Sequence, residues 1–223
     1  MYGVYLLPLR TLMSHRSRAY ARTAGVLYLV THVTSVAAVA AYAADALAVG
    51  VALELVLAGG CLGTGILLWL LLRPAGPARA ATFAGLRALE AAVVAAGTLP
   101  MLALLWTTAS APMEESLTSL HTAAFLVGQG LVISVNTVVL GWLLLDARVV
   151  PRSLAVLGIV GGALVLASNS AQLFGLIPQA GTVAGLCAVP VFAFEIWFAV
   201  HLIAVGPRPR TAAPALTGAA VAV

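Results

Sequence analysis

The stretch that decides the fold runs from Thr82 to Thr107 and reads TFAGLRALEAAVVAAGTLPMLALLWT. It exceeds the roughly 20 apolar residues that a helix needs to cross a bilayer, yet it contains Arg87 and Glu90. A charge in hydrocarbon costs at least ~2.5–3.5 kcal/mol, so a membrane helix that keeps two of them must bury them against other helices. Their i,i+3 spacing places both on one helix face, and we expect them to pair.

The composition of the whole chain points to a membrane protein. Of 223 residues, 62% are hydrophobic and 8% are charged, and the mean hydropathy is +1.10. A soluble domain carries about 25% charged residues, so this chain lacks the polar surface that water requires. Six apolar runs occupy most of the length, which predicts an all-α fold: one polytopic integral membrane domain, a six-transmembrane-helix bundle.

The predicted helices span about 22–44, 47–72, 82–107, 117–145, 151–175 and 181–205. Residues 1–21 are interpreted as an N-terminal cytoplasmic or interfacial arm, and residues 206–223 as a disordered cytoplasmic tail. The sequence does not decide between Met1 and Met13 as the first residue. Two cysteines, Cys61 and Cys187, are expected ~12 Å apart in depth at ~1.5 Å per residue, which predicts two free, buried thiols.

The basic residues alternate along the chain and predict its orientation. All eleven are arginines, and outside the spans they occur only in the N-terminal segment, the second and fourth loops and the C-terminal tail. The other loops carry only Asp45, Glu114 and Glu115. By the positive-inside rule both termini are cytoplasmic, in a bacterial inner membrane. The same placement beside the spans argues against a nucleic-acid partner, despite the net charge of +4.

The intramembrane polar residues are expected in two layers at different depths. The inner layer lies ~12–15 Å from the cytoplasmic helix ends at ~1.5 Å per residue and comprises His32, Arg87, Glu90, Asn136 and Glu195. The secondary, outer layer comprises Glu54, His121, Asn169 and Gln172. Such residues face the interior of a bundle or a water-filled cavity rather than lipid.

Two carboxylates and one guanidinium in the inner layer suggest a proton or cation site. One acid can pair with Arg87, and Glu195 is then the acid expected to lack a full counter-charge and to be protonated part of the time. This favours a small transporter- or channel-like protein. The alternative is a non-catalytic membrane subunit or sensor whose polar cluster is structural, with Glu195 permanently protonated. A weaker alternative is a membrane enzyme acting on lipid or quinone.

Sharper chemistries find no support in the sequence. No HExxH, CxxC, GxSxG or P-loop pattern occurs. His32 and His121 differ by roughly 10 Å in predicted depth, which argues against a bis-histidine haem site. We therefore expect no catalytic residues, no metal and no cofactor, and an activity other than enzymatic. The expected partners are the lipid bilayer and another membrane protein or a second copy of the chain.

Four segments resemble one known family. They are RTAGVLYLVT at 22–31, FAGLRALEA at 83–91, DARVVPRSLAVLGIVGG at 146–162 and PVFAFEIWFAVHLI at 190–203. They resemble the uncharacterised bacterial family of small integral membrane proteins catalogued as domain of unknown function four-three-eight-six. The resemblance covers roughly 22–205. It implies a six-helix membrane domain and brings no established activity.

Overall fold

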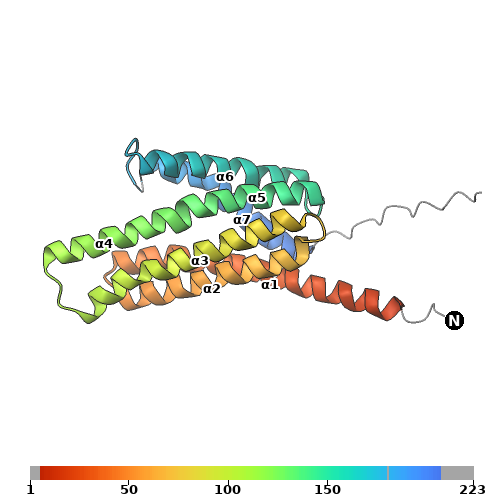
Figure 1. The fold of residues 1–223 in the computed structure, drawn as a ribbon, viewed down its shortest axis with the longest axis horizontal. Coiled ribbons are helices and arrows are strands. Elements are labelled where there is room, and N and C mark those ends of the chain that lie inside the picture. The colour runs from red at the N-terminus through yellow and green to blue at the C-terminus, as the bar shows by residue number, and fades with distance from the viewer. Residues whose placement is uncertain (1–5, 180, 207–223) are drawn as a thin grey trace, which may run out of the picture.

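The computed structural model describes residues 6–179 and 181–206, and the predicted C-terminal tail lies almost wholly outside them. Helices make up the described part, in which no strand occurs (Figure 1). The elements are α1 (Leu6–Ala43), α2 (Leu47–Leu72), α3 (Pro77–Trp106), α4 (Ala111–Phe125), η1 (Leu126–Val132), α5 (Ile133–Ala147), α6 (Arg152–Leu173) and α7 (Thr182–Ala204). The all-α prediction is therefore confirmed.

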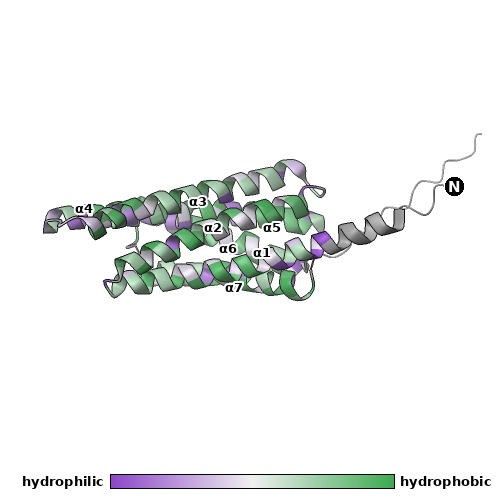
Figure 2. Ribbon diagram, turned by 90° about the horizontal axis from the view of Figure 1, so that it is seen from below, coloured by the Kyte–Doolittle hydropathy of each residue, from purple (hydrophilic) through white to green (hydrophobic). Residues whose placement is uncertain are grey.

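Six helices in the described part are long and apolar enough to cross a membrane. α4, η1 and α5 count as one of them, because they continue each other through Ala111–Ala147. Hydrophobic positions run along the whole bundle (Figure 2), and large apolar side chains such as Leu99 and Leu186 point outward, 63% and 67% exposed. A surface of this kind suits lipid, and the chain is a multi-pass membrane protein.

Three helices begin earlier than the hydrophobic pattern predicts. Pro77 stands in the first turn of α3 and a proline also stands in the first turn of α4, where the missing N–H costs no hydrogen bond. α1 already begins at Leu6, because its arginine-rich first half continues the helix toward Ala43. The polar first turns therefore extend beyond the apolar windows from which the bounds were predicted.

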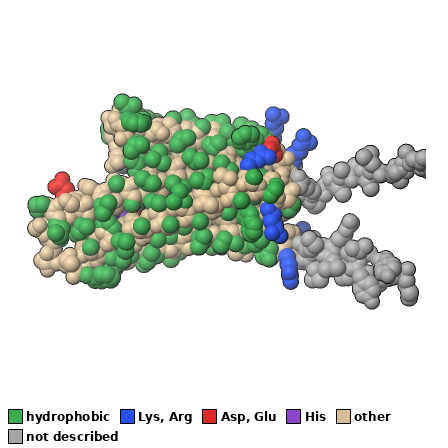
Figure 3. All heavy atoms as spheres, viewed as in Figure 1, with side chains coloured by type: hydrophobic (Ala, Val, Ile, Leu, Met, Phe, Trp, Pro, Cys, Tyr) green, Lys and Arg blue, Asp and Glu red, His purple; other side chains and the backbone are tan. Residues whose placement is uncertain are grey.

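Arginine side chains gather at one end of the bundle, where Asp146 pairs with Arg79, and Asp45, Glu114 and Glu115 belong to the other end. The α2–α3 and α5–α6 connections lie at one end together with the middle of α1, and the α1–α2, α3–α4 and α6–α7 connections lie at the other (Figure 1). Apart from buried Arg87, the arginine side chains visible in Figure 3 form a band at the first end. Exposed Glu114 belongs to the second end. This arrangement fits the predicted orientation, which stays a prediction.

Packing is tight at the arginine end and loose at the other. A large core of buried side chains, including Phe83, Leu143, Phe194 and Phe198, joins α1, α2, α3, α5, α6 and α7 near the arginine end. In contrast, none of the 15 residues of α4 is buried. α4 packs against α3 and η1, which leaves space between it and the outer half of α7. A cavity lined by Thr122, Gln179 and Ala184 lies on this looser side.

Candidate functional site

The Arg87–Glu90 ion pair forms on α3 and is buried. Arg87 Nη1 lies 2.8 Å from Glu90 Oε2 and 3.1 Å from Oε1, and the two side chains are 2% and 0% exposed. The guanidinium also donates from Nη2 to Thr64 Oγ1 on α2, at 2.9 Å. Its Cζ atom sits 5.3 Å from the centre of the Tyr28 ring on α1. The cation is thus held by three helices and by its own counter-charge.

Glu90 accepts hydrogen bonds from three further helical segments. Asn136 on α5 donates at 2.6 Å, Gln129 on η1 at 2.8 Å and the Cys61 thiol on α2 at 3.4 Å. Arg87 donates to both carboxylate oxygens as well. Hydrogen bonds to a charged group are stronger than those between neutral groups. Glu90 therefore fixes the rotation of α2, α3, η1 and α5 relative to one another.

A glycine on α2 makes room for this cluster. A Cβ atom added at Gly65 would lie 2.8 Å from the Cβ of Arg87 and 3.5 Å from the carbonyl oxygen of Ala84. Contacts below 3.0 Å force something to shift. The close approach of α2 and α3 beside the ion pair therefore depends on the absence of a side chain at this position.

The second acid, Glu195 on α7, pairs with His32 on α1. Glu195 Oε2 lies 3.3 Å from His32 Nε2, and His32 Nδ1 lies 3.0 Å from the carbonyl oxygen of Tyr28. A carbonyl only accepts, so we assign a proton to Nδ1. Nε2 and the carboxylate then need one further proton between them: either Glu195 is neutral and donates to Nε2, or His32 is an imidazolium facing a carboxylate.

A cavity of about 210 Å³ joins the two pairs. Its lining includes Arg87 and Glu90 as well as His32 and Glu195. The His32 and Glu195 side chains are 11% and 9% exposed, against 2% and 0% for Arg87 and Glu90. The structure thus brings together all five residues of the predicted inner layer, with Asn136 attached through Glu90. Whether they act as a functional site stays a prediction.

The four residues of the predicted outer layer lie in two separate clusters. Glu54 Oε1 lies 3.5 Å from His121 Nε2, and Tyr42 donates to Glu54 at 2.8 Å. Asn169 and Gln172 both belong to α6 and bond to each other at 3.2 Å. The sequence grouped these four residues because residue counts along the helices place them at similar depth. The structure separates them because the two pairs point in different directions around the bundle.

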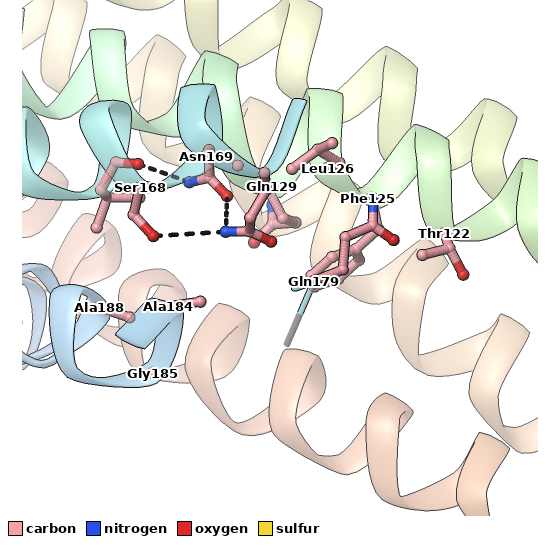
Figure 4. A pocket seen from close by; sticks show the side chains of 13 residues that line it. Thr122, Phe125, Leu126, Gln129, Ser168, Asn169, Gln179, Ala184, Gly185 and Ala188 are labelled. Carbon is pink, nitrogen blue, oxygen red and sulfur yellow. Dashed lines mark hydrogen bonds between the residues drawn. The ribbon is translucent and has the colours of Figure 1, made fainter. Parts of the chain in front are cut away.

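A second cavity, of about 290 Å³, contains the α6 pair. Gln129 and Gln179 complete an amide-rich wall, which Figure 4 shows together with Phe125 and Thr122. Sequence analysis did not single out Gln179 or Ser168, and neither stands in a pattern that would have marked it. Gln129 carries a weak signal, because it lies between Gly128 and Gly130.

One partner in each of the inner and outer layers was also missed. Thr64, which bonds Arg87, and Tyr42, which bonds Glu54, give no sign in the sequence of their partners on other helices. Both cysteines are free, as predicted, and Cys61 is buried. Cys187 is only partly buried, which corrects the prediction of two buried thiols. The outer half of α7 packs loosely, so residues there are not enclosed.

The fold and the cluster together define a polytopic helical membrane protein with a buried ionic core. The comparison with family models places it further: the family described as "Domain of unknown function (DUF4386)" matches residues 23–206. The chain belongs to this family, as the four sequence segments predicted, and the match reaches from α1 to the end of α7. No curated protein and no solved structure matches the chain.

Proposed function

We propose that this chain is a small transporter- or channel-like protein of the bacterial inner membrane with a proton or cation site at Glu195 and His32. One observation carries the proposal: the cavity that reaches Glu195 and His32 also reaches the Arg87–Glu90 pair. An ionisable group beside a cavity inside a membrane domain is the usual mark of an ion or proton pathway.

Charge counting within the cavity explains why the site would hold a proton. Arg87 and Glu90 neutralise each other at 2.8 Å. A neutral His32 beside an ionised Glu195 would leave one net negative charge in apolar surroundings, which is costly. One proton, or one small cation in the cavity, removes that charge. The site is therefore suited to exchange a proton for a cation.

The alternative, a structural polar cluster in a membrane subunit or sensor, fits the Arg87–Glu90 half of the site. Glu90 accepts from Gln129 and Asn136 and pairs with Arg87, and the Arg87 and Glu90 side chains are almost fully enclosed. We therefore assign this half to holding the helices in place. The Glu195–His32 half has fewer partners and is more exposed than the Arg87–Glu90 half, and it is where the two hypotheses differ.

The test is proton flux into liposomes that contain the purified protein and a pH-sensitive dye. A potassium diffusion potential drives protons inward, and the wild-type protein is expected to acidify the lumen faster than empty liposomes do. Glu195→Gln keeps the shape of the side chain but cannot release a proton, and it is expected to lose the flux. Glu54→Gln is the matched control, since Glu54 lines neither of the two cavities.

Two results would refute the proposal. The first is a wild-type proton flux no greater than that of empty liposomes, together with an equally low flux of a small cation such as Na⁺ measured in the same liposomes. The second is a Glu195→Gln variant that folds and transports like the wild type, because the carboxyl proton would then have no part in the activity. The second result would leave the structural interpretation of the cluster in place.

A further inference from the structure

We infer that the second cavity, between η1, α4, α6 and α7, binds a neutral amphipathic small molecule. The inference deepens the proposed function, because this molecule would be the solute whose movement is linked to the proton site. At about 290 Å³ the cavity lies near the lower end, about 300 Å³, of the pockets that hold small ligands. Its polar lining consists of the amides of Gln129, Asn169, Gln172 and Gln179 and the hydroxyls of Thr122 and Ser168.

The lining selects a ligand without charge. Four amides and two hydroxyls offer both donors and acceptors, and none of the described residues in the lining is charged. An ion would lose its hydration here without gaining a counter-charge. A neutral molecule with one or two hydrogen-bonding groups would replace its water contacts by amides. Its apolar part would lie against Phe125, Leu126 and Val165.

The hydrogen bonds already made show which groups the ligand would meet. Gln129 donates one Nε2 proton to Glu90 at 2.8 Å, so it can offer a ligand its amide oxygen, an acceptor, and its second N–H. The Asn169 amide nitrogen donates to the carbonyl oxygen of Val165 at 2.8 Å, and its Oδ1 accepts from Gln172. A ligand hydroxyl or N–H that donates to Gln129 fits this arrangement.

Gln129 also connects this cavity with the proton site. Phe125, Gln129 and Ala188 line both cavities, which therefore adjoin. Gln129 stands in the middle of η1, a π-helical segment. Such segments are rare in proteins, and those that occur are often found at functional sites. A ligand held by the Gln129 oxygen would thus act on the same amide that donates to Glu90.

Gly185 provides a way to fill the cavity without disturbing the fold. A Cβ atom added there meets nothing within 4 Å, although the residue lines the cavity. Gly59 on α2 is equally open but belongs to neither cavity. Gly185→Leu and Gly59→Leu are therefore matched substitutions, of which only the first occupies the proposed site.

The experiment measures binding of 2-naphthol, a neutral two-ring alcohol, to the full chain in lipid nanodiscs. Saturation-transfer NMR reports bound probe, and empty nanodiscs give the lipid background. We expect 2-naphthol to bind above background, whereas 2-naphthoate and 2-naphthylmethylammonium do not. Gly185→Leu is expected to weaken binding by about tenfold or more, equivalent to about 1.4 kcal/mol, and Gly59→Leu to leave it unchanged.

The outcomes separate this inference from the proton-site proposal. Glu195→Gln is expected to retain 2-naphthol binding even where it loses proton flux, because Glu195 is not part of this lining. Equal binding of the three probes would overturn the inference. So would a Gly185→Leu variant that binds like Gly59→Leu. If the protein binds 2-naphthol but passes no protons, the binding site is supported and the proposed function is refuted.

Discussion

At the scale of single residues, the two buried acids differ in what surrounds them. Glu90 accepts from Arg87, Gln129, Asn136 and the Cys61 thiol, and its charge is balanced. Glu195 lines the cavity, and its Oε2 lies 3.3 Å from His32 Nε2. In apolar surroundings a neutral acid beside a neutral imidazole costs less than two separate charges. The proton of this pair is therefore expected on Glu195.

Infrared spectroscopy can locate that proton. The purified protein is expected to show a protonated carboxyl band at neutral pH that is absent from Glu195→Gln. The Gln variant should fold like the wild type, because an amide resembles a carboxylic acid in shape, while Glu195→Ala should unfold at a lower temperature. Glu54→Gln is the control for the band assignment. If the band survives in Glu195→Gln, the proton resides elsewhere.

Arg87 is expected to be the most costly side chain to remove. Arg87→Ala leaves Glu90 buried without its counter-charge, and breaking a buried pair in this way costs about 3–5 kcal/mol. Denaturant unfolding in detergent measures the loss. The control is Arg79→Ala, which breaks the exposed pair with Asp146 and should cost at most about 1 kcal/mol.

A double variant sharpens the Arg87 prediction. Arg87→Ala with Glu90→Gln removes both charges, so it should be more stable than Arg87→Ala alone. If Arg87→Ala unfolds at the same denaturant concentration as Arg79→Ala, the buried Arg87–Glu90 pair contributes no more to the free energy of unfolding than the exposed Arg79–Asp146 pair does.

Sequence reasoning at this scale succeeds within a helix and fails between helices. The contact between Arg87 and Glu90 follows from i,i+3 spacing alone. The contacts of Arg87 with Thr64 and of Glu90 with Gln129 depend on how α2 and η1 are rotated about their axes. No local pattern in the sequence encodes that rotation. For the same reason the sequence places His32 and Glu195 at one depth but does not predict that they are in contact.

At the scale of elements, the span that contains α4, η1 and α5 shows the same limit. Its apolar length predicts one membrane helix, which the structure bears out. The π-helical segment Leu126–Val132 inside it was not predicted. A π-helix changes which residues share a face, and the sequence has no strong marker for it beyond the glycines beside Gln129. That local change brings Gln129 to Glu90.

The contact between α2 and α3 gives a prediction about packing. Gly65→Ala would place a methyl group 2.8 Å from the Cβ of Arg87, and overpacking of this kind costs about 1–3 kcal/mol. The matched control is Gly59→Ala on the same helix, where the added Cβ meets nothing within 4 Å. That variant should be as stable as the wild type or more so, because alanine favours helix over glycine.

Thermal unfolding in detergent measures both glycine variants. The expected order of stability is Gly59→Ala at or above wild type, and Gly65→Ala below it. Equal stability of the two variants would show that α2 and α3 can separate beside the ion pair without cost, against the close approach described above.

At the scale of the whole molecule, the tight core and the amide-lined cavity occupy opposite halves. The large aromatic and aliphatic core lies toward the arginine end, and α4, without a buried residue, belongs to the other. If the orientation follows the positive-inside rule, the amide-lined cavity lies nearer the periplasm than the Glu195–His32 pair does. A solute would then reach the amide-lined cavity first and the Glu195–His32 pair after it.

The orientation can be tested by cysteine labelling in intact cells. Cys61 and Cys187 are first replaced by serine, so that a single introduced cysteine reports. Glu114→Cys, in the first turn of α4, and Ala78→Cys, in the first turn of α3, are both exposed positions at opposite ends of the bundle (Figure 1). A maleimide that cannot cross the membrane should label Glu114→Cys and leave Ala78→Cys unlabelled.

The control is the same reagent on permeabilised cells, where both variants should react, which shows that Ala78→Cys is accessible once the membrane is open. The physical reason for the expected pattern is that Arg73, Arg79, Arg148 and Arg152 lie in or beside the α2–α3 and α5–α6 connections, at the Ala78 end (Figure 1). Arginine-rich loops are retained on the cytoplasmic side. Labelling of Ala78→Cys in intact cells, with Glu114→Cys protected, would reverse the orientation. The amide-lined cavity would then lie nearer the cytoplasm, and a solute would reach it from that side before the Glu195–His32 pair.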